Sequence, residues 1–268
     1  MKKIITTLSV VALTATVLNA QDTKSSKAYA RVGIGYAFPN AGNSYYSKET
    51  FTLLSHTQEV KKYSLGAGTN VMVAGGFWFS KHIGIELGIN LGVAPKKFKT
   101  YYSDLTTEVN TTLYAKMPVY IMPALMLQTG GDKLNMYSRL GLAVNVAGKV
   151  ISKSTSGNEE IIQEGNFKTG LGFQGALGVT IPATKNLSIF VEANGIAMSQ
   201  YLKKSEYTKY IAGGINQLAV MTTSDKVYEY ENSITEVAAP DPNQPSKVTS
   251  IAMPFSNIGL SAGVMFKF

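Results

Sequence analysis

The sequence of 268 residues contains no cysteine, two histidines and a single tryptophan. Without cysteine the chain forms no disulfide bond, offers no thiol nucleophile and builds no zinc site with sulfur ligands. His56 lies beside Ser55 and near Glu59, but no second catalytic grouping is visible, and His82 has no metal-binding partner in sequence. We therefore expect a protein that is not an enzyme and that has no cofactor and no metal.

Two letter patterns resemble catalytic motifs but lie in the wrong context. Residues 259–263 read G-x-S-x-G, yet a nucleophile elbow needs a strand-to-helix turn followed by a histidine, and none follows Ser261. Residues 170–175 read G-x-G-x-x-G without a βαβ unit around them. Strand-like alternation runs through both, so we interpret both as glycine packing.

Long apolar stretches are also scarce. Residues 1–20 contain the main one, from Ile4 to Leu18, with Lys2 and Lys3 before it and the Ala20–Gln21 junction after it. This order predicts a secretory signal peptide, and a buried N-terminal helix is the alternative. No other segment is long and apolar enough for a membrane helix, so a membrane-spanning form of this chain requires a closed barrel.

Acidic residues are fewer than basic ones, 17 against 25, and the formal net charge is +8. The lysines are scattered in turns and loops and form no basic stripe interleaved with stacking aromatics. We therefore expect no nucleic-acid partner. A cationic surface is suited to anionic lipid headgroups.

Apolar residues alternate with small or polar ones at the C-terminus. In the last eleven residues, 258–268, the apolar side chains share one parity, and the other parity is mostly small or polar. Successive side chains of a strand point to opposite faces, so this segment has one apolar face. The presence of Phe266 and Phe268 beside the carboxyl terminus favours a strand that faces lipid over a soluble edge strand.

Comparable alternation divides the chain into eight segments. They lie at about residues 28–38, 64–79, 83–93, 115–127, 136–146, 167–181, 187–197 and 258–268. Short turns near Lys81, Lys133 and Lys185 alternate with long connections. We predict an all-β fold over residues 21–268, a closed antiparallel transmembrane β-barrel of about eight strands with short periplasmic turns and long extracellular loops.

A secreted barrel or sandwich is the main alternative, because large apolar residues point inward in those folds. Three features favour the membrane barrel: the apolar parity is nearly free of charge, the other parity is rich in glycine, and aromatics gather at strand ends. The aromatics predict two girdles, a periplasmic one of Phe77, Phe79, Phe266 and Phe268 and an outer one of Tyr36, Phe38, Phe98, Tyr101 and Phe167.

The fourth segment contains Pro118 and Pro123. Proline lacks the backbone donor that a ladder needs, so we expect this strand to be bulged or locally unpaired. The side chains of this strand that are expected to face lipid begin with Ala115.

Four charged residues occupy the polar parity of every second strand. They are Arg31, Glu86, Arg139 and Glu192, at similar distances from the short turns. Eight strands enclose little more than side chains, and a buried charge without a partner is strongly disfavoured. We expect two cations and two anions to meet across the lumen. The alternative is four separately solvated residues that line a wet channel.

The longest connection, residues 201–254, is expected to be an extracellular loop. Its candidate interaction residues are Tyr207, Tyr210, Tyr228 and Tyr230, because tyrosine offers amphipathic contact area. The alternative is that these rings only extend the aromatic girdle and the strand ends. Within this connection, residues 220–230 are expected to form a hairpin that turns at 224–226.

With the opening Y-A-R-V-G-I-G-Y at 29–36 and the ending G-L-S-A-G-V-M-F-K-F, the chain resembles the small eight-stranded outer-membrane barrels, OmpA-like and OmpX-like. It is most similar to the outer membrane protein beta-barrel domain proteins common in Bacteroidota. The resemblance covers about residues 28–268 and implies a location in the cell outer membrane. It also implies that Phe266 and Phe268 belong to the signal read by the outer-membrane assembly machinery.

The resemblance implies outer-membrane lipid and lipopolysaccharide as partners, together with an extracellular or envelope protein. The function it implies is non-enzymatic, structural or exerted through exposed loops in adhesion or envelope integrity. A porin-like passive channel for small solutes and a subunit of an envelope secretion or uptake assembly are the alternatives. The length of the connection 201–254 leaves ten strands as an alternative to eight.

Overall fold

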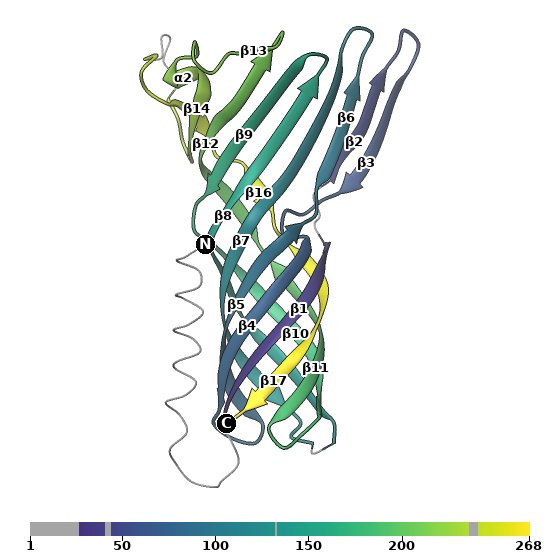
Figure 1. Cartoon of the computed structure of the whole chain (residues 1–268), viewed down its shortest axis with the longest axis vertical. Coiled ribbons are helices and arrows are strands. Elements are labelled where there is room, and N and C mark those ends of the chain that lie inside the picture. Colours follow the sequence, from purple (N-terminus) through teal and green to yellow (C-terminus); the bar gives the residue numbers. More distant parts are fainter. Residues whose placement is uncertain (1–26, 41–43, 132, 236–240) are drawn as a thin grey trace.

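A computed structural model describes residues 27–40, 44–131, 133–235 and 241–268. The expected signal peptide, residues 1–20, lies outside the described residues. Eight strands close into an antiparallel ring: β1 (Ala28–Pro39), β4 (Gly68–Trp78), β5 (Ile83–Pro95), β7 (Glu108–Gln128), β8 (Asn135–Ser156), β10 (Gly170–Pro182), β11 (Leu187–Ala197) and β17 (Asn257–Lys267). They form the tilted barrel in the lower half of Figure 1. The prediction of eight strands rather than ten is confirmed.

The ring closes between its first and last strands. β17 pairs with β1 from Tyr29–Lys267 to Pro39–Asn257, and the Phe268 N–H donates to the Ala28 carbonyl at 3.0 Å. Along β1 from Val32 to Phe38 the even-numbered residues are exposed and the odd-numbered ones are buried. The predicted two-residue period therefore separates an apolar outer face from the lumen.

Three short connections join the strands at the end of the barrel where the C-terminus lies (Figure 1). They run between β4 and β5, between β7 and β8, and between β10 and β11. Two of them close through backbone hydrogen bonds, from Phe79 to Ile83 at 2.9 Å and from Ala183 to Leu187 at 2.8 Å. The predicted short turns are confirmed.

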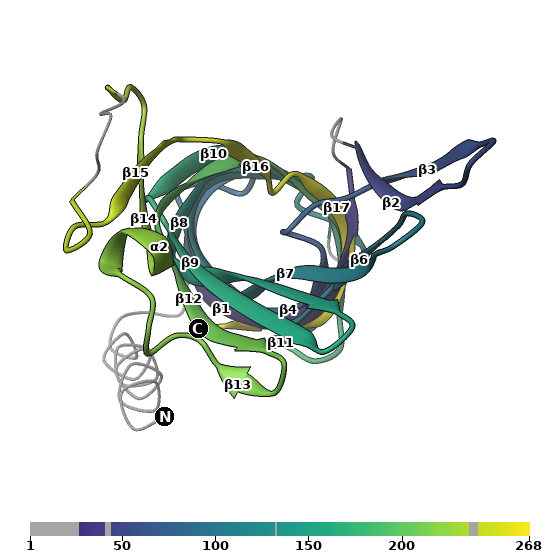
Figure 2. The same ribbon diagram turned by 90° about the horizontal axis from the view of Figure 1, so that it is seen from above.

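The other end of the barrel continues into a wide curved sheet. β7 and β8, with 21 and 22 residues, rise beyond the ring and carry further strands on both sides. These are β2 (Ser44–Phe51), β3 (His56–Lys62), β6 (Phe98–Ser103), β9 (Glu159–Phe167), β12 (Ser199–Ala212), β13 (Ile215–Asn216), β14 (Val227–Glu231), β15 (Ser246–Thr249) and β16 (Ala252–Pro254). Seen from above, β2 and β3 flare out on one side, and β14 and β15 on the other (Figure 2).

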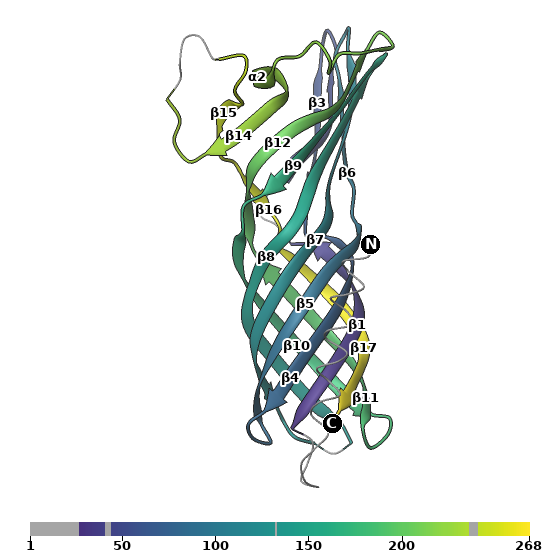
Figure 3. The ribbon, with the colours of Figure 1, turned by 60° about the vertical axis from the view of Figure 1, so that its left-hand side comes forward.

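The connections that the sequence suggested as loops are thus largely strands. β6 pairs with β7, β9 pairs with β8 and β12, and β12 also pairs with β14. Figure 3 shows β12 and β9 continuing the wall of the barrel upward. We call this part, formed by the upper halves of β7 and β8 with the strands beside them, the extension sheet.

The predicted hairpin over residues 220–230 is wrong. The segment contains the short helix α2 (Thr223–Lys226), and β14 pairs in parallel with β15. A reciprocal cap stabilises the helix: the Thr222 hydroxyl accepts from the Asp225 N–H, and the Asp225 carboxylate accepts from the Thr222 N–H. No helix in the described part of the chain is long and apolar enough to cross a membrane.

The fourth barrel strand, β7, is bulged, as its prolines predict. Its register with β8 shifts between Lys116 and Tyr120, and Met117 has a positive φ of 48°. An inserted residue reverses the parity beyond it. Ala115 was expected to face lipid, but it is fully buried for this reason.

Two members of the expected outer girdle also lie inside. Phe98 pairs with Leu113, above the bulge, and therefore faces inward. Phe167 ends β9 instead of beginning β10, and its ring packs edge-on against Phe255 at 5.0 Å between centroids. Phe98 belongs to an apolar cluster at the top of the lumen, and Phe167 packs against that cluster.

Candidate functional site in the barrel lumen

The structure brings the four charged residues together. Arg31, Glu86, Arg139 and Glu192 extend inward from β1, β5, β8 and β11, which are every second strand of the ring. Arg31 donates to Glu86 at 2.7 Å and to Glu192 at 2.9 Å. Arg139 donates to the same two carboxylates at 3.1 and 2.8 Å. All four side chains are at most 1% exposed, so they form a closed ring of buried ion pairs.

Two tyrosines complete the ring of charges, and sequence reasoning did not identify them. Tyr29 donates to Glu86 Oε2 at 2.9 Å, and Tyr137 donates to Glu192 Oε2 at 2.7 Å. Each tyrosine precedes an arginine by two residues, so a repeated Tyr-x-Arg at inward parity was the available signal. The two halves of the ring are related by an approximate two-fold repeat.

Glycines make room for the large side chains around these charges. A Cβ atom on Gly76 would overlap the Tyr29 ring, and one on Gly33 would lie 2.7 Å from Phe190 Cζ. Phe190 in turn lies 5.1 Å from the Arg31 guanidinium, within reach of a cation–π contact. The glycine-rich parity seen in the sequence thus serves to pack aromatic rings inside the barrel.

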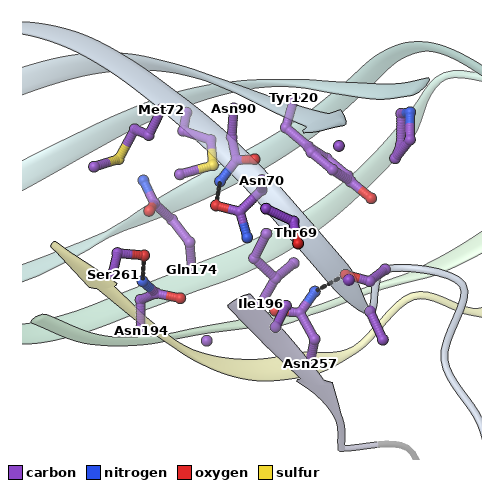
Figure 4. A pocket seen from close by; sticks show the side chains of 18 of the residues that line it. Thr69, Asn70, Met72, Asn90, Tyr120, Gln174, Asn194, Ile196, Asn257 and Ser261 are labelled. Atoms are coloured by element: carbon purple, nitrogen blue, oxygen red, sulfur yellow. Dashed lines mark hydrogen bonds between the residues drawn. The ribbon is translucent and has the colours of Figure 1, made fainter. Parts of the chain in front are cut away.

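Amide side chains line a small pocket inside the barrel (Figure 4), and Arg139 and Glu192 of the charged ring line the same pocket. Asn90 donates to Asn70 at 3.4 Å, Asn194 donates to the Ser261 hydroxyl at 2.7 Å, and Asn257 donates to the Gly66 carbonyl at 3.2 Å. The free volume between these side chains is about 30 Å³. That is room for about one or two water molecules. Ser261 of the G-x-S-x-G pattern is buried and lines the same pocket.

An apolar cap closes the lumen above the amides. Residues 64–67 were expected to begin the second barrel strand, but they form a turn before β4 begins. Leu65 N–H donates to the Pro254 carbonyl at 2.9 Å, and Phe255 N–H donates to the Met198 carbonyl at 3.0 Å. The side chains of Leu65 and Phe255 are buried, with Phe98 and Leu202 in the same cluster.

The other predicted site residues lie outside the lumen. Phe266 and Phe268 are exposed at the short-turn end of the barrel. In the extension sheet, the rings of Tyr207 and Tyr228 pack edge-on at 5.9 Å, and the Tyr230 hydroxyl lies 3.0 Å from Ser205 Oγ. Tyr210 is on the same strand as Tyr207 and is half-buried. Tyr207, Tyr228 and Tyr230 are therefore neighbours in the extension sheet.

The histidines make local contacts only. His56 Nε2 lies 2.9 Å from Glu49 Oε1 and its ring stacks on Phe51, while His82 Nδ1 donates to the Gln128 carbonyl at 3.0 Å. In the described ranges, no three histidine or acidic side chains gather in a way that would hold a metal ion.

The chain matches the family described as "Outer membrane protein beta-barrel domain" over residues 6–218. No curated protein matches it. Among solved structures it is similar to the outer membrane protein OprG from Pseudomonas aeruginosa, at 10% identity over 93% of this chain and 99% of that chain, with a TM-score of 0.45. It is also similar to Outer Membrane Protein W of E. coli, at 11% identity over 92% and 100% of the two chains, with a TM-score of 0.38. Because the family match covers most of its length, the chain belongs to the outer membrane protein β-barrel domain family, and its eight-stranded ring is a transmembrane barrel of the outer membrane.

Proposed function

We propose that this protein is a non-enzymatic, non-conducting barrel that anchors its extension sheet at the cell surface, where the sheet acts in adhesion or in the integrity of the envelope. The observation that carries this proposal is the sealed lumen. A ring of ion pairs, amide side chains and an apolar cap fill it in succession. Passage of a solute would require several of these layers to move together.

The extension sheet supports the second half of the proposal. Long strands such as β7 and β8 hold it rigidly above the barrel. It presents Tyr207, Tyr228 and neighbouring polar side chains on ordered strands. Binding sites built on strands keep their geometry better than sites on loops. An extracellular or envelope protein is the partner that such a surface would suit.

Single-channel recording tests the sealed lumen. The refolded protein is inserted into planar lipid bilayers, and the expected result is no steady conductance. The control is the double variant Leu65→Gly with Phe255→Gly, which removes two large side chains from the cap and should increase transient openings. Large, steady conductance of the unmutated protein would contradict the proposal and support the porin-like channel.

A matched pair of loop variants tests the role of the extension sheet. Replacing residues 217–249 by a short Gly-Ser linker removes α2, β14 and β15 but keeps β12 and β16. The control replaces the tip of the β2–β3 hairpin, residues 52–55. We expect both proteins to insert normally and only the first to lose attachment of cells to a surface. Unchanged attachment in both would contradict an interaction through β14 and β15.

A further inference from the structure

A basic surface covers the outer side of the extension sheet next to the barrel. Above the bulge in β7, the side chains of Phe98, Leu113 and Ala115 belong to the internal apolar cluster or pack against it. Lys97 and Lys99 have the parity opposite to Phe98, and Lys116 has the parity opposite to Ala115. These three lysines are exposed and must point away from the lumen.

The lysines of this surface outnumber its acidic residues. Lys48, Lys61, Lys97 and Lys99 line one shallow hollow, in which Glu59 is the acidic member. Some lysines elsewhere on the sheet pair with carboxylates, Lys149 with Glu164 at 2.8 Å and Lys153 with Glu160 at 2.7 Å. Among the described residues, Lys48, Lys97, Lys99 and Lys116 make no such ion pair.

The apolar band of the barrel locates these lysines relative to the hydrocarbon core of the membrane. Val93 is the last lipid-facing side chain of β5, at 49% exposed, and Lys97 follows four residues later. Met117, at 52% exposed, is the upper lipid-facing residue of β7, and Lys116 is its neighbour. A strand advances about 3.3 Å per residue, so Lys116 lies at the edge of the band and Lys97 lies within roughly 13 Å of it along the chain. The headgroup layer on each side of the hydrocarbon core is about 5–7 Å thick. Lys116 therefore lies within this layer, and the backbone of Lys97 lies above it, from where the long lysine side chain extends toward the phosphates.

We propose that Lys48, Lys97, Lys99 and Lys116 form a binding site for the phosphate groups of outer-leaflet lipid. Lysine ammonium groups attract phosphate as compact charges, and lysines next to a membrane surface each add to lipid affinity. The ring of Tyr114, with Lys97 Nζ 5.3 Å from its centroid, holds one of these side chains on the outer face. The site does not depend on whether the lumen conducts, so its test is separate from the conductance test.

Binding of lipid A that carries two phosphates tests this site. The refolded full-length chain in detergent micelles is titrated with it at low and high salt. Replacing Lys97, Lys99 and Lys116 by glutamine should weaken binding at least tenfold at low salt, and replacing them by arginine should preserve it. The matched control replaces Lys81, Lys133 and Lys185, three lysines of the short turns, by glutamine and should leave the affinity unchanged. The circular dichroism of every variant checks that the barrel is folded.

Three outcomes would overturn the proposal. Equal affinity for dephosphorylated lipid A would show that the acyl chains alone account for binding. Equal weakening in the control triple variant would show an effect of net charge. Displacement of the lipid by inorganic phosphate at the same molar concentration would show that the lysines bind a free anion and not a lipid headgroup.

Discussion

Arg31 and Arg139 stand on opposite walls of the barrel and donate hydrogen bonds to the same two carboxylates. β1 and β8 are four strands apart in either direction around the ring, and the two carboxylates extend from β5 and β11, each two strands from both arginines. The carboxylates therefore connect the two arginines across the lumen. The four charges balance, and the removal of any one of them leaves a net charge in a buried site.

Replacing Glu86 by alanine should therefore destabilise the barrel strongly. Loss of one partner of a buried ion pair costs about 3–5 kcal/mol. The double variant Glu86→Ala with Arg139→Ala leaves Arg31 paired with Glu192 and should recover part of that loss. Urea unfolding in lipid vesicles measures these two variants and the single variant Arg139→Ala. If the two single effects simply added, the residues would not act as one network.

Two adjacent glycines provide an internal comparison for the packing of Tyr29. A methyl group on Gly76 would overlap the Tyr29 ring, whereas one on Gly75 would have Tyr29 O as its nearest neighbour, at 3.9 Å. Gly76→Ala should cost about 1–3 kcal/mol through overpacking, and Gly75→Ala should change stability little. Equal unfolding midpoints for the two variants would show that Tyr29 can move aside without cost.

The parity of the barrel strands is predictable from sequence because a face in contact with lipid excludes charge. On β1, Val32 and Ile34 are exposed, as that rule requires. Arg31 has the opposite parity and is buried. The same parity, with similar distances from the turns, predicts that the four charges share one level. Sequence alone could not show whether water separates them, since that depends on how Tyr29 and Phe190 fill the remaining space.

The upper part of the molecule is less predictable, because one residue there can reverse a face. The bulge at Met117 turns Ala115 inward. Phe98 on β6 also points inward, because it pairs with Leu113 on β7, which has the same parity as Ala115. α2 is a different case. The Thr222–Asp225 capping box is a local signal of a helix start, and the hairpin interpretation overlooked it.

Acid should loosen the extension sheet at Glu160, which lies outside the membrane-spanning strands. Hydrogen bonds from Lys153 and then Lys209 hold the pKa of this carboxylate below its usual value. A lowered pKa stabilises the fold above the unfolded pKa, and that contribution is lost as the pH falls through the folded value. Hydrogen exchange in β9 should therefore accelerate between about pH 5 and about pH 3. In Glu160→Gln the acceleration should be smaller, and an identical pH profile would exclude this cause.

Removal of Phe268 tests the role of the C-terminal strand in assembly. Its N–H closes the ring onto Ala28, but its side chain packs on the outside of the barrel. We expect the shortened chain to refold in detergent with little loss of stability and to reach the outer membrane of cells at a lower level. Phe79→Ala, a change at another exposed aromatic of the same end, is the control. Equal levels in both variants would count against a specific terminal signal.

The outer face of β5 gives the most direct test of membrane insertion. Leu87 is 57% exposed in the middle of an alternating strand, and the neighbouring Glu86 and Gly88 point inward. An arginine that faces lipid at this depth costs about 2–4 kcal/mol. Leu87→Arg should therefore lower the stability and yield of the inserted barrel, whereas Leu87→Ala keeps the face uncharged and should have a small effect. The fraction of protein that folds into lipid vesicles measures the difference. If Leu87→Arg inserted as well as Leu87→Ala, this face would not be in contact with hydrocarbon.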